Sequence, residues 1–190
     1  MENNPSIPSK AAPNVDILSL FRMPWNISDN AFGWLEPTRS CDMDCEYCYQ
    51  VHDPQSHKST AEFEKEVRGL LSMRRCDGII IAGGEPLTHP NIIEVVKITS
   101  SHKVKTLLLT NGNRLTPNLA GQLKEAGLKG FIFHVDSHQN RPGWTGKTEG
   151  EINELRQRLT DMVFDAGGMF CGFNTAIVPS ALEELKDIVA

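Results

Sequence analysis

The chain lacks the features that mark membrane-spanning, secreted and nucleic-acid-binding proteins. Its 190 residues contain no apolar run near the roughly 20 residues that cross a bilayer. The first ten residues, MENNPSIPSK, lack the apolar core of a signal peptide. The net charge is −5, and no basic stretch is long enough to follow a phosphate backbone. We therefore expect a globular cytoplasmic protein with no membrane span and no nucleic-acid partner.

Cysteine is scarce and odd in number. The chain has five, and without an export signal we expect reduced thiols rather than disulfides. Cys76 and Cys171 lie in or beside apolar segments and are predicted to be small core residues. Cys41, Cys45 and Cys48 stand together in CDMDCEYCYQ. Because a disulfide needs two cysteines and a structural zinc site needs four ligands, this group of three predicts a metal or a cluster.

Short apolar segments alternate with helical patterns, as in parallel α/β proteins. The helical segments carry capping boxes that start at Ser59 and Thr148, and Pro90 and Pro117 suit first-turn positions. The pattern favours a partial parallel β/α barrel of about five βα units, with a doubly wound open sheet as the alternative. The strands are expected at residues 31–38, 78–82, 104–109, 130–135 and 169–178.

Polar clusters follow these strands, and the carboxyl ends of parallel strands gather at one edge. The clusters are Gly83-Gly84-Glu85-Pro86, Thr110-Asn111-Gly112 and Asp136-Ser137-His138, and Asn174 falls within the fifth strand. Glycines allow a tight turn and close approach to a ligand, and Glu85 offers an acceptor for a cationic group. Each cluster could also be an ordinary turn or cap.

Two polar residues lie inside the expected strands. Asn174 sits in an apolar segment, where an amide needs a partner, so contact with a ligand is one explanation. His134 is two residues from Asp136 and should share its face. His134 is therefore either a substrate-side group or a satisfied core histidine.

The connection after the fourth strand is longer than the others, because the strand starts fall at residues 78, 104, 130 and 169. The extra length lies mainly in residues 137–150, which include His138, Arg141 and Trp144. We expect this loop to close over a substrate, with Arg141 binding an anionic or polar group. The alternatives are a surface excursion, or pairing of Arg141 with Glu149 or Glu151.

The C-x3-C-x2-C motif, with Tyr47 before its last cysteine and Gly-Gly-Glu-Pro about 35 residues later, resembles the radical S-adenosylmethionine superfamily over roughly residues 31–178. The resemblance implies that Cys41, Cys45 and Cys48 hold a [4Fe–4S] cluster, whose open iron binds S-adenosylmethionine. Reductive cleavage of that cofactor would give a 5′-deoxyadenosyl radical that abstracts hydrogen from a substrate.

The resemblance also implies contacts and partners. The implied cofactor-contacting residues are Tyr47, Gly83, Gly84, Glu85, Pro86, Asn111, Asp136, Ser137 and Asn174. A small-molecule or peptide substrate is expected, with an electron donor such as flavodoxin or ferredoxin. The motif order looks most like the branch that includes molybdenum-cofactor and peptide-maturation enzymes.

Two alternatives remain open. The same cysteines could form a non-catalytic iron–sulfur or zinc-binding scaffold, with zinc completed by His52 or His57. Residues 1–30 are expected to be a partly disordered extension, and residues 31–190 a core domain that lacks the family's sixth βα unit. The chain would then be a fragment, or another chain would cover the edge of the fifth strand.

Overall fold

The computed structural model describes residues 26, 28–176, 182–183 and 187. Most of the predicted N-terminal extension, residues 1–25 and 27, lies outside the described residues, as do residues 177–178 of the predicted fifth strand. In the described part, no helix is long and apolar enough to cross a membrane.

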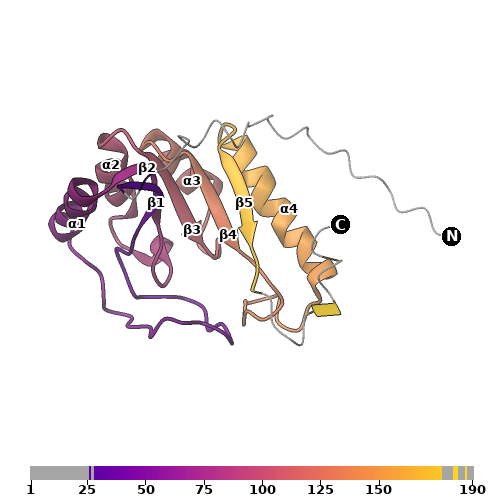
Figure 1. Ribbon diagram of the computed structural model, residues 1–190. Helices are drawn as coiled ribbons and strands as arrows, with labels where there is room; N and C mark the ends of the chain where they lie inside the picture. The colour runs from indigo at the N-terminus through magenta and orange to yellow at the C-terminus, as the bar shows by residue number, and fades with distance from the viewer. Residues whose placement is uncertain (1–25, 27, 177–181, 184–186, 188–190) are drawn as a thin grey trace.

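A parallel five-stranded sheet with strand order β1-β2-β3-β4-β5 forms the centre of the fold. Helices connect successive strands (Figure 1). The short 3-10 helix η2 follows β2. The strands are β1 (Asp29–Leu35), β2 (Arg75–Ile81), β3 (Lys105–Thr110), β4 (Gly130–His134) and β5 (Phe170–Asn174). The helices are α1 (Thr60–Met73), η2 (Pro86–Thr88), α2 (Ile92–Ser101), α3 (Pro117–Glu125) and α4 (Glu149–Asp165).

The strand order distinguishes between the two predicted architectures. Each strand is added beside the previous one without a reversal. Because parallel crossovers are nearly always right-handed, this order places the connecting helices on one face of the sheet. A doubly wound sheet would reverse its order partway. The chain therefore forms an open α/β partial barrel of five strands in its described part, as predicted, and the doubly wound alternative is wrong.

The core lies between the sheet and these helices. Alternate residues of β4, Phe131 and Phe133, point to the same side, and their rings stack with centroids 5.4 Å apart. They belong to one buried cluster that also contains Ile79 and Ile81 of β2. This packing fixes the strands and so fixes the positions of the loops at their carboxyl ends.

The predicted start signals of the helices are mostly confirmed. Both capping boxes form: Ser59 caps α1 and Thr148 caps α4, each with the reciprocal bond from its glutamate. Pro117 opens α3. The prediction for Pro90 is wrong, because Asn91 is the N-cap of α2 and Pro90 therefore precedes the helix.

Strand ends differ from the prediction by a few residues. β1 runs from Asp29 to Leu35, and Thr38, which was expected in this strand, instead forms an isolated antiparallel bridge with His57. β2 begins at Arg75, where it pairs with Asp29. β5 ends at Asn174 among the described residues.

Candidate functional site

The three clustered cysteines line one cavity at the carboxyl ends of the strands. The cavity has a volume of about 110 Å³. It is also lined by both glycines of the turn after β2 and by groups from the ends of β3 and β4. The lining also includes Tyr47, His52, Thr110, Asn111, His134 and Gln139. The topology thus brings together groups that are almost 100 residues apart in sequence.

The cysteine thiols differ in exposure. Cys41 and Cys45 are partly buried, whereas Cys48 is exposed and its Sγ lies 3.3 Å from His52 Nε2. Burial raises the pKa of the Cys41 thiol to about 11, and nearby Glu85 and Asp42 add to the rise. Burial also raises the pKa of the Cys45 thiol to about 11, with further rises from Cys41 and Cys48. The thiols are therefore close enough to resist joint ionisation unless a cation compensates them.

The two histidines considered as zinc ligands lie in different surroundings. His52 contacts Cys48, but His57 Nδ1 lies 2.9 Å from Thr38 Oγ1 and its ring packs edge-on against His89 at 5.5 Å. Among the described residues, no group of three or more His, Cys, Asp or Glu side chains converges closely enough to hold one metal ion. His57 therefore belongs to a separate packing contact.

The glycine turn after β2 (residues 83–86) packs against the start of the cysteine loop, the segment that carries Cys41, Cys45 and Cys48. Gly84 N donates to Thr38 O at 3.1 Å, and Glu85 N donates to Ser40 O at 2.7 Å. A Cβ on Gly83 would lie 2.2 Å from Thr38 O, and a Cβ on Gly84 would lie 2.4 Å from Ser40 O. Gly83 also has a φ of 124°, a conformation that favours glycine. The glycines therefore allow two segments of the chain to approach each other beside the cavity.

Glu85 was predicted to offer an acceptor to a cationic ligand, and its environment does not agree. The side chain is fully buried, and its carboxylate accepts bonds from Thr110 Oγ1 at 2.6 Å, Asn111 N at 2.7 Å and Leu87 N at 2.8 Å. Burial raises the pKa of Glu85 to about 7, against the opposing effect of these hydrogen bonds. Glu85 instead joins the end of β2 to the end of β3, with Pro86 buried at the start of η2.

Asn111 connects β3 to the cysteine loop. Its Nδ2 donates to Asp42 Oδ1 at 2.9 Å, and its Oδ1 accepts from Asn113 N at 2.8 Å. Arg114 Nε donates to Asp42 Oδ2 at 2.9 Å. Burial acts to raise the pKa of Asp42, but the bonds from Asn111, Asn113 and Arg114 outweigh it and lower the pKa. No periodic pattern marks Asp42 as a site residue, because its partners are about 70 residues away in the chain.

Asp136 organises the end of β4. Its carboxylate accepts from His134 Nε2 at 2.8 Å, His138 N at 3.0 Å and Ala176 N at 3.1 Å. Burial acts to raise the pKa of Asp136, but the His134 bond and the backbone bonds lower it overall. The expectation that His134 and Asp136 share a face is confirmed, and His134 lines the cavity.

Ser137 and Asn174 take different positions at the same edge. Ser137 N donates to Glu149 Oε1 at 2.6 Å. Asn174 ends β5 and is exposed, so the expectation of a buried strand amide is wrong. Its position at the strand end, where water can solvate it, removes the need for a buried partner.

Arg141 turns into the protein rather than toward solvent. It is 4% exposed, and its Nη2 donates to Asn111 O at 2.6 Å, Gln139 Oε1 at 3.0 Å and His134 O at 3.4 Å. This placement does not agree with the predicted substrate anchor. The alternative pairing is also wrong, because Glu149 pairs with Arg156 and Glu151 pairs with Lys147. Backbone carbonyls at the ends of β3 and β4 bind the guanidinium instead.

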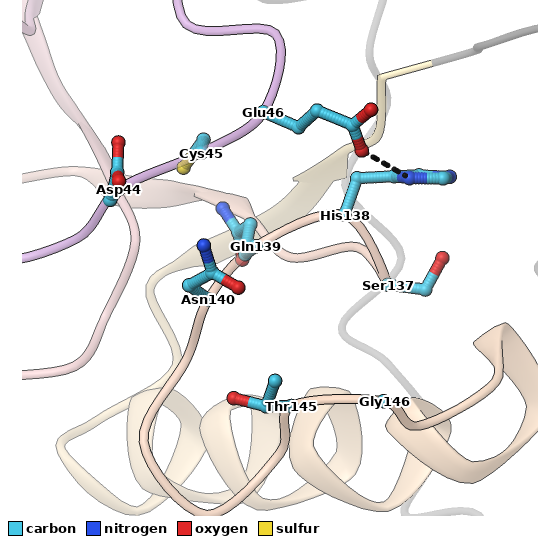
Figure 2. Close-up of a pocket in the computed structure, with 9 residues that line it drawn as sticks. All are labelled: Asp44, Cys45, Glu46, Ser137, His138, Gln139, Asn140, Thr145 and Gly146. Atoms are coloured by element: carbon cyan, nitrogen blue, oxygen red, sulfur yellow. Dashed lines mark ion pairs between the residues drawn. The ribbon is translucent and has the colours of Figure 1, made fainter.

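A second cavity of about 400 Å³ lies between the cysteine loop and the loop after β4 (Figure 2). Its lining is polar, and His138 Nδ1 lies 3.4 Å from Glu46 Oε2 on one side of it. Cys45 and Gln139 line both cavities, so the two adjoin. The lining residues are Asp44, Cys45, Glu46, Ser137, His138, Gln139, Asn140, Thr145 and Gly146.

Comparison with known proteins gives a consistent assignment. Residues 35–188 match the Radical SAM superfamily. An AdoMet-dependent heme synthase of Methanosarcina barkeri is 26% identical over 79% of this chain and 43% of its own length. A GTP 3',8-cyclase of Microcystis aeruginosa is 32% identical over 79% of this chain and 49% of its own length.

The fold comparison agrees with the sequence comparison. The solved structure of native anSMEcpe with bound AdoMet superposes with a TM-score of 0.59 at 15% identity, covering 83% of this chain and 48% of that one. The chain thus spans about half the length of the relatives that it matches. The match to residues 35–188, most of the sequence, shows that the chain belongs to the Radical SAM superfamily.

Proposed function

We propose that the chain carries a [4Fe–4S] cluster on Cys41, Cys45 and Cys48 and binds S-adenosylmethionine beside it, as part of a radical enzyme. One observation carries the proposal: a single cavity is lined by all three cysteines and by Gly83 and Gly84. These two motifs are distant in sequence, and the chain belongs to a family whose solved relative anSMEcpe has bound AdoMet.

The donor set fits a cluster. Iron–sulfur clusters are held by cysteine thiolates, and three protein ligands leave one iron for another ligand. Cys41 and Cys45 have raised pKa values because they are buried near other acidic groups. Iron would compensate this accumulation of negative charge and displace the thiol protons. His57 is held by Thr38, which counts against its role in a zinc site.

The chain's own residues would bind and orient the cofactors. Cys41, Cys45 and Cys48 would hold the cluster, which would supply the electron for reductive cleavage of S-adenosylmethionine and so start hydrogen abstraction from the substrate. Gly83 and Gly84 line the cavity, and their lack of side chains lets this turn pack against Thr38 and Ser40 at the start of the segment that carries the cysteines. Asn111 and His134 line the same cavity, and Asp136 holds the His134 ring in place.

The other residues expected to contact S-adenosylmethionine lie in different surroundings. Tyr47 lines the cavity and is 53% exposed, so it can contact a ligand or a partner. Glu85 and Pro86 would act by shaping the turn from within the protein. Ser137 lines the second cavity, and Asn174 stands at the exposed end of β5.

The second cavity is the proposed place for the substrate, a polar small molecule or a peptide segment. It adjoins the cysteine cavity through Cys45 and Gln139. Its carboxylates, Asp44 and Glu46, favour a ligand rich in hydrogen-bond donors over the anionic group expected from Arg141. An electron donor such as flavodoxin or ferredoxin would reduce the cluster.

Anaerobic reconstitution with iron and sulfide tests the proposal. We expect brown protein with absorbance near about 400 nm that changes when S-adenosylmethionine is added. Cys45→Ala should lose the iron, whereas the matched control Cys76→Ala, at a buried cysteine of β2, should keep it. Stoichiometric zinc with no response to S-adenosylmethionine would instead support the scaffold alternative.

A further inference from the structure

Gln139 stands against a cysteine of the proposed cluster site although it belongs to the loop after β4. Cys45 and Gln139 form an isolated antiparallel bridge. The neighbouring backbone continues the contact, because Glu46 N donates to His138 O at 3.3 Å and Asn140 N donates to Asp44 O at 3.4 Å. The two loops are thus joined at the point where the two cavities meet.

The side chain of Gln139 is held in one orientation. It is 3% exposed, and its Nε2 donates to His134 O at 2.9 Å. Its Oε1 accepts from Arg141 Nη2 at 3.0 Å. Because the oxygen faces a cation, the assignment of the amide oxygen and nitrogen is determined by the surroundings.

The second N–H of this amide lies beside Cys45. Side chains of residues paired in an antiparallel bridge point to the same side, and Figure 2 shows the Gln139 nitrogen on the side that faces the Cys45 sulfur. A primary amide has two N–H donors, and His134 O takes one of them. The charge of Arg141 on the amide oxygen polarises the group and makes its N–H a stronger donor.

We infer that the Gln139 amide, oriented by Arg141, donates a hydrogen bond to the ligating sulfur of Cys45 and is thereby a positioning residue that sets the reduction potential of the cluster. This inference rests on the proposed function. A hydrogen bond to a ligating sulfur stabilises the form of the cluster with more negative charge, which is the reduced form. The cluster takes up one electron from its donor, so a stronger bond makes that uptake easier and raises the potential.

The test is a redox titration of the anaerobically reconstituted chain with dithionite, followed by the electron paramagnetic resonance of the reduced cluster. Gln139→Met keeps the side-chain length and removes the donor. At a fixed solution potential, we expect the ratio of reduced to oxidised cluster to fall at least threefold. For a one-electron couple at 59 mV per tenfold change, this equals a drop of about 28 mV.

Two further variants separate the hydrogen bond from other effects. Gln139→Glu keeps an oxygen for Arg141 but places a carboxylate beside sulfur, so its potential should fall further than that of Gln139→Met. Asn140→Leu removes an amide from the next position of the same loop, which lines the same cavity, and should keep the wild-type potential.

The outcomes are distinct. Failure of the unaltered chain to take up a cluster would overturn the proposed function itself. If the unaltered chain takes up a cluster but both Gln139 variants have the wild-type potential, only the role of Gln139 is overturned. An equal drop of the potential in Asn140→Leu would also overturn that role, because the effect would not be specific to Gln139. Loss of the cluster from both Gln139 variants would overturn it too, because Gln139 would then act in folding or assembly.

Discussion

Replacing Glu149 by Ala should be among the more destabilising single changes in this chain. Glu149 is 1% exposed and forms an ion pair with Arg156, which is 7% exposed. Glu149 also accepts from Ser137 N at 2.6 Å, so it holds the start of the loop after β4 against the start of α4. Removal of the carboxylate leaves a buried guanidinium without its counter-charge and a backbone N–H without its acceptor.

The magnitude follows from the partners that remain. Removing one member of a buried ion pair costs about 3–5 kcal/mol. Arg156 keeps bonds to Val135 O at 2.8 Å and Asn153 Oδ1 at 2.7 Å, which lessen the loss. The missing acceptor for Ser137 N adds a loss, but the two terms are not additive. We therefore expect Glu149→Ala to lower the free energy of unfolding by about 3–4 kcal/mol.

Urea unfolding followed by far-ultraviolet circular dichroism measures this change. The matched control is Glu154→Ala on the same helix, which removes an exposed i,i+4 pair with Arg158. That pair should contribute only about 0.3–0.5 kcal/mol. A double variant, Glu149→Leu with Arg156→Leu, should be more stable than Glu149→Leu alone, because no unpaired buried charge remains. Equal losses in Glu149→Ala and Glu154→Ala would refute the reasoning.

Three further predictions concern Gly84, Glu85 and Arg141, which lie around the cavity. Gly84→Ala should reduce stability by about 1–3 kcal/mol and impair iron uptake, because its Cβ would meet Ser40 O at 2.4 Å. Gly69→Ala in α1 is the control for Gly84→Ala, because a Cβ at Gly69 would have no atom within 4 Å. This control should raise the free energy of unfolding in urea by about 0.5–1 kcal/mol. Folding raises the pKa of Glu85 from 4.5 to about 7, so the folded protein holds this proton more tightly than the unfolded chain does. The resulting stabilisation should be fully present below pH 4.5 and should be lost as the pH rises through 7. Urea unfolding should show this loss as about 3 kcal/mol. Glu85→Gln cannot titrate at this position, so it should not show the loss. If Glu85→Gln kept the wild-type pH dependence, the prediction would be wrong. Arg141→Ala should lower the thermal midpoint together with the cleavage of S-adenosylmethionine, whereas an unchanged midpoint would favour a surface role for Arg141.

The sequence determined the architecture and the location of the site. Apolar runs separated by capped helical segments specify alternating strands and helices, and both capping boxes form at Ser59 and Thr148. These are local signals, since propensity, capping and periodicity act over a few residues. The motif of three cysteines and the glycine turn were assigned to one edge because parallel strands end together. The cavity that contains both motifs agrees with that reasoning.

Only the tertiary structure decided what the polar side chains contact. Glu85 and Arg141 look like ligand-binding groups in the sequence, yet both are buried and bind the chain's own donors and carbonyls. Asn174 looks buried in an apolar run, yet it stands at the exposed end of β5. Gln139 belongs to the loop expected to close over a substrate, residues 137–150, but no local signal predicts its contact with Cys45. That contact exists because two loops more than 90 residues apart meet above the sheet. Hydrogen-bond partners at such separations depend on loop packing, which residue type and local periodicity do not encode.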